Sequence, residues 1–431
     1  MSDKTGDNTG NKKRYYPRKK KDNNVVVEQI TFIDTIQQSP KKTVENEESQ
    51  NLTKEQFKID YSKPIDEIDF PIKSLSDLVE VGKLYLSKDF ASKNYSINVK
   101  GIYEMTESLL ELISIVGLES VKTDILEYIL FFSQDLHNVK KIQAPKRENK
   151  RQENPSVIFQ LFNPGTSSSH TPDYTYVSKD DKLIEDDCLY DLTHIVITGP
   201  PGCGKTLLAR ILAKISLHLG ISTNDKFIVA KRSDLVGEYL GVTAIKTQKL
   251  IDKALGGTLL IDEAYSLGNT DKDVYSKECI DTLNQNLTEK KGQFQCIIVG
   301  YEEELEKNFF SMNPGLKRRF PFKYNIEKYT SLELLEIFLL KVDKIKYKIK
   351  KPTAVWLKST NYFQNKMDNF KAFGGDIETF LFNVKIEHGK RVFGKHPALH
   401  KIITKEDIEC GYERYLKHKT KVKDYNQFLY L

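Results

Sequence analysis

A loop in the middle of the chain has the residue types and spacing of a phosphate-binding loop. Its eight residues are Gly199, Pro200, Pro201, Gly202, Cys203, Gly204, Lys205 and Thr206. The glycines let backbone N–H groups wrap around phosphates, Lys205 can reach the outer phosphates, and Thr206 can coordinate Mg²⁺. An apolar run at 194–198 precedes the loop and a helical apolar pattern at 207–215 follows it. This strand–loop–helix order is the context that the chemistry requires, so a chance glycine-rich turn is disfavoured.

Two adjacent carboxylates, Asp262 and Glu263, follow the apolar run 257–261. In a doubly wound sheet the carboxyl end of such a strand lies beside the phosphate loop. We therefore expect Asp262 to belong to the Mg²⁺ shell. Glu263 is the better candidate to polarise an attacking water, because a metal-bound carboxylate has its charge already committed. Taken alone, the pair is equally compatible with a helix N-cap, but together with the phosphate loop it favours catalysis.

Arg318 and Arg319 form the third candidate group. Only ten of the 66 basic residues are Arg, and these two are the only ones between Arg232 and Arg391. Arg differs from Lys in its planar guanidinium, which binds carboxylates and phosphates in a bidentate manner. The pair therefore has either a specific role or the simpler one of binding a surface carboxylate.

The elements that must position these groups follow from the apolar pattern. Five short apolar runs alternate with segments long enough for helices: 194–198, 227–230, 258–261, 296–299 and 322–326. This alternation predicts an α/β fold with a doubly wound, parallel, five-stranded sheet. We expect four regions: a disordered polar tail over 1–65, a helical segment over 66–107, the α/β core over 108–329 with an inserted loop at 138–188, and a helical lid over 330–431.

Composition limits the remaining function classes. The 431 residues are 39% hydrophobic and 29% charged, with a net charge of +6 and no apolar run that could span a bilayer, so we expect a cytoplasmic protein without a membrane role. Five dispersed cysteines argue against a disulfide framework and a zinc site. The basic cluster 12–21 could bind nucleic acid or act as a nuclear address, although a solvated charge run is the favoured interpretation.

Several motifs together resemble those of the CbbX/CfxQ group of AAA+ ATPases, which includes the red-type rubisco activases and stage V sporulation protein K. The segments that carry the resemblance are 115–122, 232–241, 243–257, 261–267, 300–301 and 313–320. The resemblance covers 108–330 well, the lid loosely and the tail not at all. It implies ATP and Mg²⁺ as cofactors, and ATP hydrolysis between the subunits of a ring, a hexamer by resemblance. It further implies a protein substrate, but no residue specifies rubisco or any other target.

The resemblance also implies roles for individual residues. Arg319 lies at the position of the arginine that completes a neighbour's ATP site, with Arg318 beside it. The segment Tyr239-Leu240-Gly241 resembles the loop that lines the central pore and grips an extended polypeptide, whereas its spacing alone favours a tyrosine packed in the core. Tyr301 replaces the Asn with which many AAA proteins orient the water.

The lid departs from the family pattern. Relatives carry a Phe-Gly-Asn-Ala-Arg type motif whose Arg senses nucleotide, whereas this chain has 373–377 as Phe-Gly-Gly-Asp-Ile. Arg391 and Lys385 are alternative candidates for the missing arginine.

Three other functions compete with that of a ring-forming ATPase that remodels a protein. A nucleic-acid motor of the clamp-loader or branch-migration type has a similar core, and the basic tail is compatible with it. The tetrapeptide 365–368 matches the guanine-binding Asn-Lys-x-Asp motif but follows no predicted strand, and a small-molecule kinase would need neither a pore aromatic nor an arginine from a neighbour. His396 and His400 have helical ligand spacing, but Pro397 between them favours exposed histidines over a metal site.

Overall fold

The computed structural model describes residues 63–134, 193–239, 241–268 and 273–428, with side chains described up to residue 419. The predicted tail up to residue 62, the inserted loop at 138–188 and Leu240 lie outside the described residues. In the described part, no helix is long and apolar enough to cross a bilayer.

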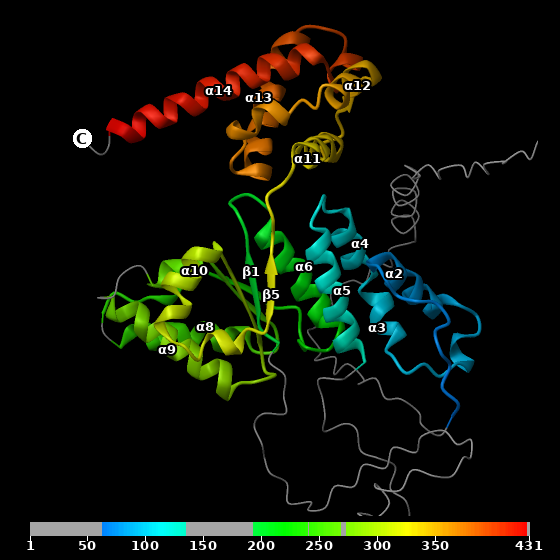
Figure 1. The fold of residues 1–431 in the computed structure, drawn as a ribbon, viewed down its shortest axis with the longest axis vertical. Coiled ribbons are helices and arrows are strands. Elements are labelled where there is room, and N and C mark those ends of the chain that lie inside the picture. The colour runs from blue at the N-terminus through cyan, green and yellow to red at the C-terminus, as the bar shows by residue number, and fades with distance from the viewer. Residues whose placement is uncertain (1–62, 135–192, 240, 269–272, 429–431) are drawn as a thin grey trace, which may run out of the picture. The chain divides into compact units, whose positions relative to one another are not determined.

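Five parallel strands form the central sheet in the order β2-β3-β4-β1-β5 (Figure 1). Their bounds are β1 Ile195–Thr198, β2 Phe227–Ala230, β3 Thr258–Asp262, β4 Gln295–Gly300 and β5 Phe322–Asn325. Each predicted strand agrees with the observed one to within a residue at either end. The α/β fold class with a five-stranded parallel sheet is therefore confirmed.

Helices cover both faces of this sheet (Figure 1). On one face lie α5 (Glu119–Ser133) and α6 (Lys205–His218). On the other lie α8 (Val242–Ala254), α9 (Val274–Glu289) and α10 (Glu302–Asn308). The short elements between them are α7 (Arg232–Leu235), η6 (Ala264–Gly268), η7 (Phe310–Met312) and η8 (Lys317–Arg319).

The strands are apolar on both sides because each face contributes to a separate core. Ile195 and Ile197 of β1 belong to the core that includes α5 and α6, whereas Val196 belongs to the core that includes α8, α9 and α10. This alternation follows from the two-residue period of a strand, whose side chains point to opposite faces. It explains why the sequence shows continuous apolar runs instead of alternation.

The helices before the sheet are α2 (Leu75–Lys83), α3 (Val99–Glu104) and α4 (Thr106–Ser114), with the 3₁₀ turns η1 (Leu84–Leu86) and η2 (Phe90–Ser92). Ser74 begins α2 with a capping box to Asp77. The apolar faces of α2 and α4 join the same core as α5 and α6, as the apolar periodicity predicted.

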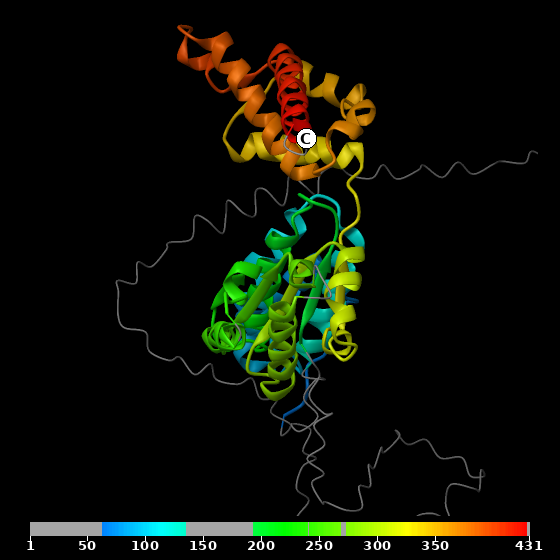
Figure 2. The ribbon, with the colours of Figure 1, turned by 90° about the vertical axis from the view of Figure 1, so that its left-hand side faces the viewer.

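The region after β5 contains α11 (Ser331–Lys344), α12 (Lys351–Ser359), α13 (Phe373–Val392) and α14 (Lys405–Phe428), with 3₁₀ turns η9 (Gln364–Asn369) and η10 (Pro397–Leu399). Figure 2 shows these helices from the side, with α14 in red along α13. The predicted capping box at Thr330 and Glu333 is confirmed. The predicted helical character of this region is confirmed, and within it β6 (Lys348–Ile349) and β7 (Ile402–Ile403) pair in parallel.

Candidate functional site

The strand register brings the predicted phosphate loop and the predicted carboxylates to one edge of the sheet. Thr198, the last residue of β1, pairs with Gly300 of β4, and Asp262 of β3 pairs with Val299 of β4. Because the strands are parallel, the residues that follow them emerge at this common carboxyl edge. The phosphate loop, Glu263 and Tyr301 are therefore neighbours, as the sequence predicted.

Within the loop, the Lys205 ammonium lies over the loop's own carbonyls. Its Nζ donates to the Gly199 oxygen (2.9 Å) and to the Pro200 oxygen (2.7 Å). Burial lowers the pKa of Lys205, and the carboxylates of Asp262 and Glu263 oppose that shift. Lys205 thus lies between the carbonyls of the loop that follows β1 and the carboxylates at the end of β3.

The residues of the loop fit a nucleoside triphosphate with Mg²⁺. The first turn of α6 has no side-chain cap, which leaves its N–H groups available to phosphate oxygens. Gly204 has a φ of 91°, and a Cβ at this position would meet no atom within 4 Å, so the loop is open where phosphates would approach. Thr206 is exposed on the same turn. When bound, Mg²⁺ would neutralise charge on the phosphate oxygens.

A cluster of protein ligands is not needed for this metal. In the described residues, no group of three or more His, Cys, Asp or Glu side chains is arranged to hold a metal ion. Mg²⁺ that accompanies a nucleotide takes one or two protein ligands and completes its shell with phosphate oxygens and water. Thr206 and Asp262 can supply that number.

Glu263 has an unusual backbone conformation. Its φ is 54°, in the left-handed region that is costly for residues other than glycine, Asn and Asp. The turn is closed by a hydrogen bond from the Ser266 N–H to the Glu263 carbonyl (2.9 Å). This turn places an exposed carboxylate directly after Asp262, whose side chain is half-buried. Such strain is frequent at functional sites, where surrounding contacts hold it in place.

Tyr301 follows β4 and lies beside the phosphate loop. Lys205 Nζ lies 4.8 Å from the centroid of the Tyr301 ring, and the ring of Tyr265 stacks on Tyr301 at a centroid distance of 5.2 Å. Burial, together with the charge of Glu263, raises the pKa of Tyr301. Its hydroxyl therefore keeps its proton at neutral pH and can donate a hydrogen bond. Tyr265 was not identified from the sequence.

Arg318 and Arg319 lie on η8, at the opposite edge of the sheet. Three residues later, Phe322 of β5 pairs with Ile195, the first residue of β1, so η8 lies at the amino edge. The length of β1 alone separates the two edges by about 10 Å. The structure therefore does not bring these arginines together with the phosphate loop of the same chain.

Contacts to α9 and to its own turn orient Arg319. Its Nε donates to Thr288 Oγ1 (2.8 Å), near the C-terminal end of α9, and its Nη1 donates to the Gly315 carbonyl (2.7 Å). Arg318 is exposed on the same turn.

The predicted pore segment follows α7. The Tyr239 side chain is 71% exposed, so it is not packed in the core. Gly241, the N-cap of α8, has a φ of 79°, a conformation that glycine adopts readily. Gly237 donates its N–H to Thr243 Oγ1 (3.0 Å), which closes the segment against α8.

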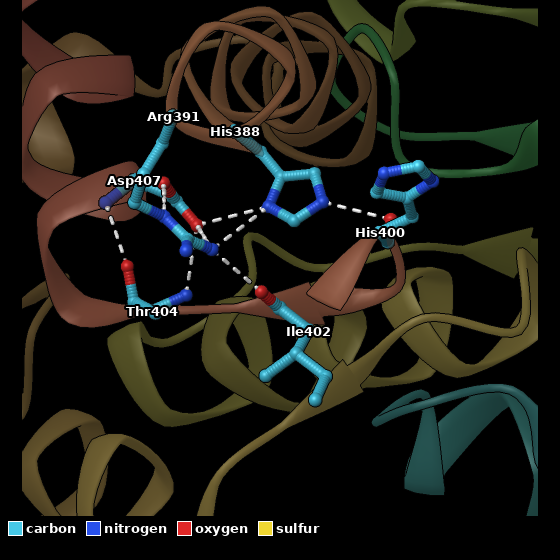
Figure 3. Close-up of polar contacts among 6 residues, drawn as sticks. All are labelled: His388, Arg391, His400, Ile402, Thr404 and Asp407. Atoms are coloured by element: carbon cyan, nitrogen blue, oxygen red, sulfur yellow. Dashed lines mark hydrogen bonds and ion pairs between the residues drawn. The ribbon is translucent and has the colours of Figure 1, made fainter. Parts of the chain in front are cut away.

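Arg391 is engaged inside the lid and does not replace the missing arginine (Figure 3). Its Nε donates to Asp407 Oδ1 (2.7 Å), and its Nη2 donates to Asp407 Oδ2 (2.9 Å) and to the Ile402 carbonyl (2.8 Å). His388 lies beside them and must carry a proton on Nε2, because that atom contacts the His400 carbonyl at 2.8 Å. This buried network joins α13 to the start of α14. Lys385, the other candidate, is exposed on α13.

The lid instead contacts the phosphate loop through its backbone. The Gly374 N–H donates to the Gly202 carbonyl (3.1 Å). A Cβ on Gly202 would lie 1.9 Å from the Ala372 oxygen, so only glycine permits this approach. The residue at the position of the family's arginine, Ile377, is fully buried in the core.

A cavity of about 230 Å³ lies beside the phosphate loop. Its lining residues are Leu118, Glu119, Ser120, Val121, Glu327, Lys328, Tyr329, Thr330 and Glu333. The Tyr329 hydroxyl donates to the Cys203 carbonyl (3.1 Å), which connects the cavity to the loop. Sequence reasoning missed this cavity. Gly117, which precedes the lining segment and has a φ of 68°, was the signal of a tight turn there.

Comparison with known proteins agrees with this geometry. Residues 195–328 match the ATPase family associated with various cellular activities (AAA). A putative cfxQ-like protein of Acanthamoeba polyphaga mimivirus is 37% identical over 358 residues, which cover 82% of this chain and 75% of that protein. The chain belongs to the CbbX/CfxQ group of AAA+ ATPases. It is accordingly an ATPase that binds ATP and depends on Mg²⁺.

Two further relatives of this AAA+ ATPase cover less of it. A CfxQ homolog of Galdieria sulphuraria is 31% identical over 217 residues, which are 50% of this chain and 69% of that protein. Stage V sporulation protein K of Bacillus subtilis is 42% identical over 156 residues, which are 36% of this chain and 48% of that protein. The chain thus spans about half the length of the sporulation protein.

Two predicted alternatives find no support in the geometry. The segment 365–368 lies in η9, which follows a helix instead of a strand, and its Lys366 donates to the Tyr362 carbonyl (3.0 Å). His396 accepts a hydrogen bond from the Ala398 N–H (3.1 Å) as the N-cap of the short turn η10, and His400 is its C-cap, so the two histidines do not share a helical face.

Proposed function

We propose that this AAA+ ATPase assembles into a ring, a hexamer by family resemblance, and uses ATP hydrolysis to remodel a protein that it threads through a central pore. The observation that carries the proposal is the position of Arg319. It lies at the amino edge of the sheet, whereas the phosphate loop lies at the carboxyl edge. An arginine placed there serves a nucleotide only if the nucleotide belongs to a neighbouring copy.

Each residue at the carboxyl edge has a distinct proposed role. Lys205 binds the outer phosphates, and Thr206 and Asp262 hold Mg²⁺. Glu263 accepts the proton of the attacking water, for which its exposed carboxylate is suited. The protonated hydroxyl of Tyr301 donates a hydrogen bond to the water or to a phosphate oxygen.

We propose the cavity beside Leu118 as the site of the adenine base. The lining combines apolar and aromatic residues, Leu118, Val121 and Tyr329, with polar residues of the segment after β5 such as Thr330 and Glu333. The hydroxyl of Tyr329 connects this cavity directly to the phosphate loop, so the base and the phosphates of one nucleotide can occupy adjoining sites.

For the substrate, we propose the loop 239–241. An exposed aromatic offers a large contact area with little side-chain entropy to lose, which suits repeated gripping of an extended chain. The glycine that follows lets the loop change conformation.

The regions 66–107, 108–329 and 330–431 are the proposed domain organisation, with the inserted loop 138–188 in the core.

The proposal is tested by measuring mass and ATPase turnover on the same preparation. With ATP and Mg²⁺, the Glu263→Gln protein should bind nucleotide and assemble, because only water activation is removed. The wild-type protein should show turnover that rises with protein concentration as subunits associate. A preparation that stays monomeric at every concentration and still hydrolyses ATP at full rate would contradict the ring.

The class of substrate is tested by adding single-stranded DNA, duplex DNA, RNA or an unfolded protein separately. Stimulation of the ATPase by unfolded protein is expected. Stimulation by nucleic acid alone would favour a nucleic-acid motor instead.

A further inference from the structure

Arg232 joins three elements near the carboxyl edge of the sheet. It is the first residue of α7, which leads into the loop of Tyr239. Its Nη1 donates to the Ser266 carbonyl (2.7 Å) and to Ser276 Oγ, and its Nη2 donates to Asp273 Oδ2. Ser266 belongs to η6, and the other two partners form the start of α9. One side chain of α7 therefore contacts both η6 and the start of α9.

The contact with Ser266 reaches the turn that holds Glu263. The Ser266 N–H donates to the Glu263 carbonyl, so the carbonyl bound by Arg232 belongs to the turn that keeps Glu263 at its φ of 54°. Gly268, at the end of η6, packs so closely against the Asn308 carbonyl that a Cβ there would lie 1.3 Å from its oxygen. The Ser266 residue thus links the turn of Glu263 to the guanidinium of Arg232.

The contact with α9 is equally well defined. Asp273 is the N-cap of α9, and its Oδ1 accepts from the Ser276 N–H (3.1 Å) while its Oδ2 accepts from Ser276 Oγ (2.8 Å). The Asp273 side chain is 14% exposed and that of Arg232 is 35% exposed. Burial opposes the ionised form, but hydrogen bonds from Arg232 and Ser276 keep the pKa of Asp273 below its ordinary value. The carboxylate is therefore a charged and fixed anchor.

We propose that Arg232 is a positioning residue that couples the turn of Glu263 to the substrate loop of Tyr239. This coupling rests on the functions that we propose for Glu263 in hydrolysis and for the loop of Tyr239 in substrate binding. The role requires a planar fork with several donors in one rigid geometry, because the Ser266 carbonyl and the Asp273 carboxylate must be bound simultaneously. A lysine could bind one of them as a point charge but not both in this arrangement.

The proposal is tested by hydrogen–deuterium exchange of the full chain with and without Mg²⁺ and a non-hydrolysable ATP analogue. When the analogue is added, the wild-type protein should show slower exchange in the phosphate loop (199–206). In addition, the exchange rate of 233–239 should change at least threefold. Arg232→Met and Arg232→Lys should retain the first response and lose the second. Lys290→Met is the matched control, since it removes another α9 ion pair, to Asp252 (2.5 Å), at the opposite end of the helix.

Asp273→Asn provides a second variant that keeps the helix cap, because Asn caps as well as Asp. It should reduce the response of 233–239 without abolishing the response of 199–206. In steady-state assays, Arg232→Lys should lower kcat about tenfold. KM should stay within twofold of wild type, because Lys205 still binds the phosphates. A rise in KM with kcat unchanged would contradict the positioning role of Arg232.

The outcomes separate the coupling from the nucleotide site itself. If 199–206 does not respond to the analogue in the wild type, the proposed nucleotide site is wrong. If 199–206 responds but 233–239 does not, the coupling is wrong while the site stands. An equal response of 233–239 in Arg232→Met and Lys290→Met would likewise overturn the role of Arg232. If Arg232→Met loses the response of 199–206 but Asp273→Asn keeps it, the Asp273→Asn protein decides. A reduced response of 233–239 in that protein supports the coupling, and a wild-type response overturns it.

Discussion

Mixing two inactive variants tests whether Arg319 acts on a neighbour. Arg319→Ala and Glu263→Gln should each retain nucleotide binding and lose hydrolysis. The first removes an arginine that, supplied in trans, contributes about 10³- to 10⁵-fold to the rate, and the second removes the group that activates the water. The two lesions lie at opposite edges of the sheet. In a mixed ring, an Arg319→Ala subunit keeps its own Glu263 and can receive the intact arginine of a Glu263→Gln neighbour.

The expected size of the rescue follows from random assembly. With equal amounts, about half of the sites carry an intact Glu263, and about half of these face an intact Arg319 across a head-to-tail interface. About a quarter of wild-type turnover should return, measured as phosphate release after subunit exchange. Mixing Glu263→Gln with Lys205→Ala is the control, because both lesions affect the same side of the interface and no arrangement restores a site. Absence of rescue in the first mixture, with both proteins assembled, would show that Arg319 does not act in trans.

Four further results are expected. Lys205→Ala should weaken ATP binding by about 100-fold, measured by calorimetry, because charge-assisted hydrogen bonds to the phosphates are lost; unchanged affinity would exclude the site. Tyr239→Ala should leave ATP affinity unchanged and abolish stimulation of the ATPase by unfolded protein, whereas retained stimulation would argue against the pore loop. Burial lowers the pKa of His194 to about 4, so this histidine is protonated at a higher pH in the unfolded chain than in the folded protein. Stability should therefore fall by about 2 kcal/mol between pH 7 and pH 5 in urea titrations, and His194→Asn should remove this part of the slope. Asp407→Asn should lower the free energy of unfolding by about 3 kcal/mol, because it removes the buried anion that pairs with the partly buried Arg391, and a wild-type value would show that the network is dispensable.

Much of the core could be predicted because its signals are local. The apolar runs around 195–198 and 258–262 have the length of buried strands, and the phosphate loop between strand and helix has few alternative interpretations. The capping box at Thr330 marked the start of α11 within four consecutive residues. Parallel register then brings Asp262 to the loop without further information.

The features that could not be predicted depend on contacts between distant segments. The cavity joins residues near Leu118 with residues near Tyr329, which are far apart in the chain. The pairing of β6 with β7 involves two residues on each side, too few to show a period. The role of Arg391 was open because a sequence does not reveal that Asp407 would be buried beside it.

Helix α9 carries a consequence for how neighbouring copies would communicate. Its N-terminal end is held by the guanidinium of Arg232, and Thr288 near its other end holds Arg319. Its sixteen residues form a rod about 24 Å long. In the proposed ring, α9 would connect the surroundings of one subunit's Glu263 with the arginine that the same subunit offers to its neighbour. Because such coupling is reciprocal, a change at either end of the helix would affect the other end.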